Sequence, residues 1–185
     1  MNRYIAFLRA INVGGHTVKM EVLRRLFEDA GLADVETFIA SGNIIFSSGV
    51  RKPESLEKII EVQLQAALGY EVVTFIRSAE ELAAVAAHEP YPASEFSAGA
   101  TLYISFLKRP PDAETVRSTQ ALGNAIHEFH FHARELYWLR RRQLGDEVYS
   151  GPVIERSLRG PVTMRNASTV RKLAEKYKPL HPGKK

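Results

Sequence analysis

The 185-residue sequence contains no cysteine and no apolar run that approaches the roughly 20 residues needed to span a bilayer. Without cysteine the chain has no disulfide, no thiolate metal ligand and no cysteine nucleophile. Without a long apolar run, no membrane partner is expected. We therefore expect a cytoplasmic protein.

Sequence signatures of several enzyme classes are also missing. The chain has no Gly-x-x-x-x-Gly-Lys-Ser/Thr loop for nucleotide phosphates and no Gly-x-Gly-x-x-Gly dinucleotide turn. It has no Gly-x-Ser-x-Gly nucleophile elbow of a hydrolase. No general base can be named and no cofactor is predicted, so the sequence leaves open whether the protein is an enzyme.

What is present is an ordinary globular composition, with 45% hydrophobic and 25% charged residues. This length can bury a core as one domain or as two small ones. The net charge of +4 is unevenly distributed. Residues 1–100 hold nine Lys and Arg against thirteen Asp and Glu, whereas residues 101–185 hold sixteen against eight. The basic half either attracts phosphates or nucleic acid or is a solvated surface, and the oligomeric state stays open.

The first half predicts a ferredoxin-like order of strand, helix, strand, strand, helix and strand. The expected elements are a strand over 3–9, a helix over 20–30, a hairpin of strands 35–39 and 44–46, a helix over 53–69 and a strand over 71–76. Thr17 is the expected N-cap of the first helix, and Gly31 the expected stop. A further helix over 79–87 follows.

The second half repeats this element order after a segment rich in Pro, Ser and Gly at 89–100, which predicts a linker. The expected elements are strands over 101–107, 125–132 and 135–140, and helices over 110–120, 152–159 and 168–177. A fourth strand is not evident. We predict an α+β protein of two ferredoxin-like (βαββαβ-type) halves with antiparallel sheets, divided as 1–88, 89–100 and 101–185.

Gly14 and Gly15 lie between the first strand and the first helix, flanked by Arg9, Asn12 and Lys19. Backbone N–H groups at a helix N-terminus can bind an anion, and a strand-end arginine can bind a planar one. The simpler interpretation is that the two glycines only let the chain turn tightly.

Two further motifs have both a structural and a functional interpretation. Ser41-Gly42-Asn43 is typical of a turn, and we expect it at the opposite edge of the sheet from the first loop, so that one small ligand cannot contact both. Arg165 and Asn166 precede the last helix and could form a second anion-binding corner. Alternatively, Asn166 or Ser168 caps that helix.

The hairpin over 127–140 combines histidines, aromatic side chains and arginines. A two-residue turn at Ala133-Arg134 would pair Phe129 with Trp138 and Phe131 with Leu136 on one face. His130 and His132 would share the other face and could bind a metal, but we expect a solvated polar face and no metal site.

Aromatic and basic residues are also clustered at the end of this hairpin. Arg140, Arg141 and Arg142 follow Tyr137 and Trp138, a mixture typical of proteins that stack on single-stranded nucleic acid. The alternative is that these aromatic side chains belong to the core.

Several separated motifs together resemble the bacterial family known as domain of unknown function 1697 (DUF1697). They are Arg9–Gly15, the helix positions Met20, Leu23 and Leu26, Ser41–Phe46, Thr163–Asn166 and Thr169-Val170. The resemblance covers nearly the whole chain and implies a compact α+β protein of two related halves, without an established activity. Two positions depart from the family pattern: Ala10 replaces a usual glycine, and Ala167 stands where an aromatic residue commonly follows.

From these observations we expect binding of a small anionic or phosphorylated ligand between the two halves. Gly14, Gly15 and the helix at Lys19 would supply N–H groups, and Arg9, Lys19 and Arg165 would supply positive charge. Asn12 and Asn166 would orient the ligand. The alternative is a nucleic-acid-binding module that uses the basic second half.

Overall fold

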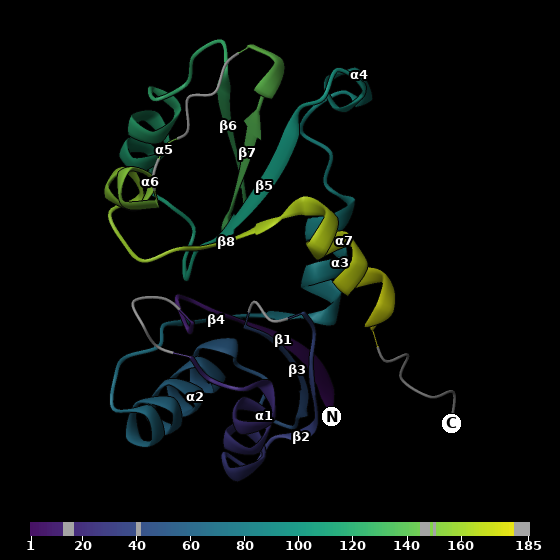
Figure 1. The fold of residues 1–185 in the computed structure, drawn as a ribbon, viewed down its shortest axis with the longest axis vertical. Coiled ribbons are helices and arrows are strands. Elements are labelled where there is room, and N and C mark those ends of the chain that lie inside the picture. The colour runs from purple at the N-terminus through teal and green to yellow at the C-terminus, as the bar shows by residue number, and fades with distance from the viewer. Residues whose placement is uncertain (13–16, 40–41, 145–148, 150, 180–185) are drawn as a thin grey trace. The chain divides into compact units, whose positions relative to one another are not determined.

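The computed structural model describes residues 1–12, 17–39, 42–144, 149 and 151–179 (Figure 1). The chain divides into two compact units, Met1–Ala84 with Lys172–Lys185, and Val85–Arg171. The boundaries fall inside two helices, α3 (Ala79–Ala87) and α7 (Ala167–Lys176). Each of these helices therefore supplies residues to both units.

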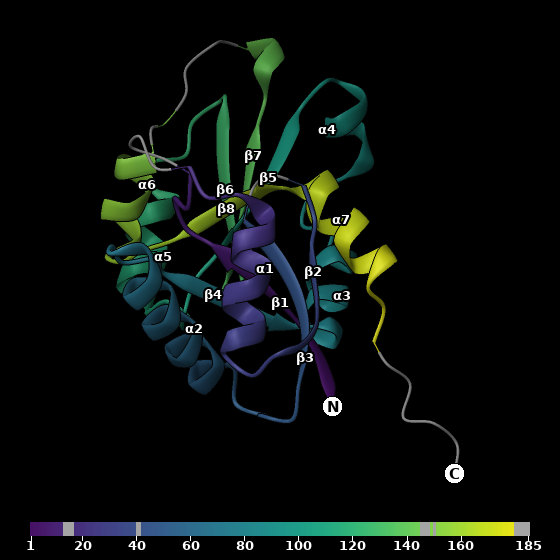
Figure 2. The ribbon, with the colours of Figure 1, turned by 60° about the horizontal axis from the view of Figure 1, so that its bottom comes forward.

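The first unit is built on a four-stranded antiparallel sheet in the order β2-β3-β1-β4. Its strands are β1 (Asn2–Leu8), β2 (Ala33–Thr37), β3 (Asn43–Ser48) and β4 (Thr74–Ser78). Two helices, α1 (Met20–Asp29) and α2 (Pro53–Leu68), cover one face of the sheet, as Figure 2 shows. The βαββαβ order and the central place of β1 confirm the predicted ferredoxin-like fold.

The helices of the first unit form where the sequence has helical hydrophobic spacing. In α2, Leu56, Ile60 and Leu64 recur every four residues and are at most 1% exposed. They pack with alternate residues of β1, such as Ala6 and Leu8, in one core. Gly69 ends α2 in the left-handed conformation, with φ 80° and its N–H on the carbonyl of Gln65.

The predicted start of α1 was wrong in one respect. Its N-cap is Lys19 rather than Thr17, and among the described residues no side-chain capping hydrogen bond is formed at this helix. The side chain of Asn12, further back in the chain, instead accepts the N–H of Val18 at 2.7 Å. Gly31 follows the helix end with φ 79°, as expected for a stop residue.

The second unit repeats the same topology, with its antiparallel sheet in the order β6-β7-β5-β8. Its strands are β5 (Thr101–Phe106), β6 (His127–His132), β7 (Glu135–Arg140) and β8 (Thr163–Asn166). Helices α5 (Ala113–Gln120) and α6 (Gly151–Leu158) pack against each other on one face, and a short helical turn, η1 (Arg142–Leu144), follows β7.

The expectation that the second half lacks a clear fourth strand was wrong, because β8 is present. This strand has only four residues and lies at the edge of the sheet. Only Thr163 is buried, whereas Met164 is 40% exposed. An edge strand of this length has no hydrophobic alternation from which it could be predicted.

Residues 89–100, the expected linker, contain the helix α4 (Ala93–Ser97) and belong to the second unit. Tyr91 is 7% exposed, and its hydroxyl donates to the carbonyl of Tyr137 at 3.2 Å. The predicted division into 1–88, 89–100 and 101–185 stays a prediction. Within the described ranges, no helix is long and apolar enough to cross a membrane.

Candidate functional site

The C-terminal end of β1 is held on both sides by backbone hydrogen bonds. The N–H of Leu8 donates to the carbonyl of Gly42 at 2.8 Å, and the N–H of Arg9 donates to Val73 at 2.9 Å. β1 lies between β3 and β4 in the sheet, so these two bonds join it to the residues just before β3 and just before β4. Arg9 therefore leaves the sheet from a backbone position that is fixed from two directions.

The chain turns at Ala10, where φ is 53°. This left-handed conformation costs an L-residue with a side chain about 1–2 kcal/mol and is readily adopted by glycine. The resemblance to DUF1697 implies a glycine at this position. Ala10 therefore adopts the left-handed conformation that a glycine would adopt, and it does so at a conformational cost.

The loop after β1 is closed by side chains. Asn12 accepts the N–H of Val18 through Oδ1, and the hydroxyl of Tyr70 donates to the carbonyl of Ile11 at 3.2 Å. Lys19, which is exposed, follows Val18 directly and begins α1. The contact between Asn12 and Val18 brings Asn12 close to the start of α1. We call Arg9, Asn12 and Lys19, the three candidate residues of this loop, the β1 corner.

The other predicted binding residues have different outcomes. Gly14 and Gly15 lie outside the described residues. Arg165 and Asn166 belong to the second unit, so their participation in a shared site stays a prediction.

Gly42 and Asn43 lie beside the end of β1, and the prediction that placed the Ser41-Gly42-Asn43 turn at the opposite edge was wrong. Asn43 pairs with Phe7 because β1 and β3 are antiparallel neighbours, so the end of β1 meets the start of β3. A Cβ on Gly42 would lie 2.9 Å from Cγ2 of Ile11. Ser41 itself lies outside the described residues.

Asn43 also has the structural role expected of a turn residue. Its side-chain amide donates to the carbonyl of Phe38 at 3.0 Å, and its carbonyl accepts the N–H of Phe38 at the same distance. Phe38 and Asn43 are thus joined by two hydrogen bonds, and Gly42 lies close to Ile11 in the loop after β1. One feature of the sequence pointed to this proximity: Arg9–Gly15 and Ser41–Phe46 both belong to the motifs that resemble DUF1697.

The second motif has a clear structural function at Asn166. Its Oδ1 accepts the N–H of Ser168 at 2.9 Å and the Ser168 hydroxyl at 2.8 Å, so it caps α7. Arg165 donates from Nη1 to Oγ1 of Thr163 and to the carbonyl of Met164, both at 2.9 Å. Burial lowers the pKa of Arg165 to about 10, so the guanidinium stays charged at neutral pH.

The strand pairing predicted for the second hairpin is confirmed. Phe129 pairs with Trp138 and Phe131 with Leu136 across the turn at Ala133-Arg134. The opposite face is not simply solvated, because another histidine packs on it.

This histidine is His88, which follows α3 and was not linked to the hairpin from the sequence. Its ring stacks on His132, with centroids 4.0 Å apart, and its Nε2 lies 3.3 Å from Nε2 of His130. Burial and the neighbouring His132 and His130 lower the pKa of His88. In the part of the chain that the structure describes, no group of three or more His, Asp or Glu side chains is arranged to hold a metal ion.

The aromatic and basic residues of the hairpin are largely engaged in the fold. Trp138 is 2% and Tyr137 0% exposed, and Nε1 of Trp138 donates to Nδ1 of His127 at 3.1 Å. These rings belong to the core and do not offer a stacking surface. Arg140 is also buried, at 7% exposed.

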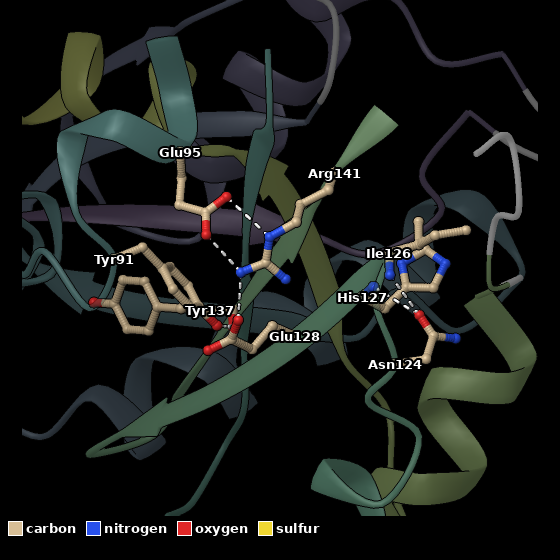
Figure 3. Close-up of polar contacts among 8 residues, drawn as sticks. All are labelled: Tyr91, Glu95, Asn124, Ile126, His127, Glu128, Tyr137 and Arg141. Carbon is tan, nitrogen blue, oxygen red and sulfur yellow. Dashed lines mark hydrogen bonds and ion pairs between the residues drawn. The ribbon is translucent and has the colours of Figure 1, made fainter. Parts of the chain in front are cut away.

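Arg141 forms an ion-pair network in the second unit (Figure 3). Its guanidinium donates to both carboxylate oxygens of Glu95, at 2.9 and 2.7 Å, and to Glu128 at 2.6 Å. The hydrogen bond from Arg141 holds the pKa of Glu95 below its usual value. Figure 3 also shows Asn124, whose Oδ1 accepts the N–H groups of Ile126 and His127 at the start of β6.

The fold defines this chain as an α+β protein of two ferredoxin-like halves. The chain belongs to the family described as "Protein of unknown function (DUF1697)", whose model matches residues 1–137. The sequence motifs at 163–170 lie beyond this match.

Among solved structures, the chain is similar to the conserved bacterial protein SP0830 from Streptococcus pneumoniae. The two share 24% sequence identity with a TM-score of 0.69, over 95% of this chain and 98% of that one. This likeness shows the fold alone. No curated protein matches the sequence.

Proposed function

We propose that the β1 corner binds a small anionic or phosphorylated molecule. The observation that carries this proposal is that Lys19 is the N-cap of α1 and that Asn12 accepts the N–H of Val18 directly before it. Arg9, three residues before Asn12 in the chain, would supply a second cationic side chain. The helix N-terminus adds a partial positive charge to the same place.

Each residue of the β1 corner has a distinct chemical role in this proposal. The Arg9 guanidinium is a planar fork that suits carboxylate or phosphate oxygens, and the Lys19 ammonium is a point charge. Oδ1 of Asn12 is occupied by the N–H of Val18, so Asn12 offers the ligand its Nδ2 hydrogens. All three side chains act as donors, which suits an anion.

The packing around the corner supports a preorganised site. Gly42 contacts Ile11, and Tyr70 bonds the Ile11 carbonyl, so the loop that carries Arg9 is held from two sides. A site with fixed donors loses less entropy on binding than a loop that must first be ordered. This gives the Ser41-Gly42-Asn43 motif a function in building the site as well as in turning the chain.

Thermal unfolding with inorganic phosphate or ADP at millimolar concentration tests the proposal, at matched ionic strength. We expect the wild type to be stabilised and Arg9→Ala to lose most of the gain. A charge-assisted arginine contact contributes about 1.5–3 kcal/mol, or about ten- to a hundredfold in affinity. Arg51→Ala, in the exposed loop before α2, is the matched control and should respond like the wild type.

A second variant should act in the opposite direction. Glu21 lies in the first turn of α1, where its carboxylate opposes a bound anion. Glu21→Gln should therefore strengthen phosphate binding. Equal responses of the wild type, Arg9→Ala and Glu21→Gln would show that the anions act elsewhere and would reject the proposal.

Nucleic-acid binding is the less favoured function, because the aromatic side chains on which it rested are buried. No reaction is proposed. A role of Arg165 and Asn166 toward the same ligand and a cytoplasmic location remain predictions.

A further inference from the structure

We propose that His88 and His130 together bind a divalent transition-metal ion, with Zn²⁺, Co²⁺ and Ni²⁺ as the expected class. The carrying observation is the distance of 3.3 Å between their Nε2 atoms. Both residues belong to the second unit, so this site is independent of the β1 corner.

The separation of the two nitrogens fits a shared tetrahedral ion. A Zn–N distance of about 2.0–2.1 Å places two ligating nitrogens about 3.4 Å apart. The centroids of the His88 and His130 rings are 5.3 Å apart, farther than the two Nε2 atoms. The ring nitrogens are therefore turned toward each other, as two ligands of one ion require.

The two imidazoles are positioned by different parts of the second unit. His130 is on β6, opposite Tyr137 of β7. His88 is held by ring contacts, because it stacks on His132 with an angle of 16° between the planes and lies 4.9 Å from the Tyr137 ring. The Tyr137 hydroxyl donates to the carbonyl of Val85 at 3.0 Å, which fixes the chain just before His88.

The site would have two protein ligands and open positions for water or a small molecule. His88 and His130 are half-buried and His132 is exposed, so an ion can reach the pair from solvent. This description agrees with the absence, within the described residues, of a group of three or more metal-ligating side chains. The sequence analysis considered the pair His130 and His132 and expected no metal site. The proposed pair is a different one, because His132 stacks on His88 and supports it.

Metal titration of the full chain after removal of bound metal with EDTA tests the inference. We expect one Co²⁺ ion per chain with a d–d absorption spectrum, and calorimetric competition by Zn²⁺. His88→Phe and His130→Phe should each lower the affinity about tenfold or more, since loss of even an outer-sphere partner costs about 10–100-fold. Phenylalanine keeps the ring and removes the ligating nitrogen.

His132→Phe is the matched control, because it preserves the stacked ring and should retain metal binding. Circular dichroism without metal checks that each variant is folded, and His88→Gln replaces His88→Phe if that variant is unfolded. Wild type that binds no Co²⁺ would show that the histidines form only a hydrogen-bonded pair and would overturn the proposal. Unchanged affinity in the folded His88 variant, or loss of binding in His132→Phe, would also overturn it.

Discussion

The hydroxyl of Tyr177 donates to a carboxylate oxygen of Glu36 at 2.8 Å, although the two residues are 141 positions apart. The Tyr177 ring contacts Phe38 edge-on, and the Lys176 ammonium lies 4.8 Å from the centroid of the same ring. Arg3 donates to the carbonyl of Lys178. The last described turn of the chain is therefore part of the first unit, which begins at the opposite end of the sequence.

This relationship predicts a graded loss of stability in variants of Tyr177. Tyr177→Phe removes the hydrogen bond and should lower the free energy of unfolding by about 1 kcal/mol. Tyr177→Ala also removes a ring that is 4% exposed and should cost about 3–5 kcal/mol. Urea unfolding followed by circular dichroism gives both values. Equal losses in the two variants would show that the ring does not pack as described.

Gly42→Ala should destabilise the first unit more than Gly69→Ala. Both glycines have left-handed φ, 69° and 80°, so both variants carry a conformational cost of about 1–2 kcal/mol. Only at Gly42 does the new Cβ meet packed atoms, Cγ2 of Ile11 at 2.9 Å and Cβ of Leu8 at 3.1 Å, whereas the space at Gly69 is open. We expect about 1–3 kcal/mol of additional loss at Gly42. Thermal unfolding of the paired variants measures it, and a larger loss at Gly69 would contradict the packing at the corner.

Ala10→Gly should leave the stability unchanged or raise it by up to about 1.6 kcal/mol. The substitution relieves the left-handed strain of about 1–2 kcal/mol and increases the entropy of the unfolded chain by about 0.4–1 kcal/mol. Ala67→Gly, at an exposed position inside α2, is the control and should lose about 1 kcal/mol. If chemical denaturation shows equal losses for the two variants, Ala10 does not have the φ of 53° found here.

Glu95→Gln should lower the melting temperature of the second unit more than Glu128→Gln. Each change removes one negative charge, but Glu95 accepts two hydrogen bonds from Arg141 and Glu128 accepts one. The chain has a single tryptophan, Trp138, whose fluorescence reports on this unit. Added salt should reduce the difference between the two melting temperatures, because salt screens ion pairs. The reverse order of the two variants would contradict the bidentate contact.

Asp112 should make the stability of the second unit sensitive to acid. Its carboxylate accepts the N–H of Thr115 at 2.7 Å as the cap of α5, and this hydrogen bond holds the pKa of Asp112 below the ordinary value of an aspartate. Because the folded-state pKa is below the unfolded one, the stabilisation is present above the unfolded pKa. It is lost as the pH falls through the folded pKa. Asp112→Asn keeps a cap oxygen that does not titrate. The melting temperature of this variant should therefore fall less steeply than that of the wild type as the pH is lowered. Parallel profiles for the two proteins would show that the cap does not contribute.

The elements that the sequence predicted well depend on local patterns. The hydrophobic spacing of Leu56, Ile60 and Leu64 specifies α2 without reference to the rest of the chain. The turn at Ala133-Arg134 likewise specifies the pairing of Phe129 with Trp138, because turn length sets the register of a hairpin. Two such ferredoxin-like element orders were enough to predict the fold class.

The β1 corner was only partly predictable. Asn12 and Val18 are only six residues apart, so a contact within this loop could be expected. The place of Gly42 beside this loop depends on the antiparallel pairing of β1 with β3, which lies outside any local window.

The sequence by itself determined the repeated α+β architecture and the hairpin register, since each arises from neighbouring residues. Only the tertiary structure decided that β8 joins the edge of the second sheet, that His88 meets His130, and that Tyr177 bonds Glu36. These contacts join segments separated by many residues. Their free energy is realised only when the whole chain has packed, so no periodicity or motif in the sequence records them.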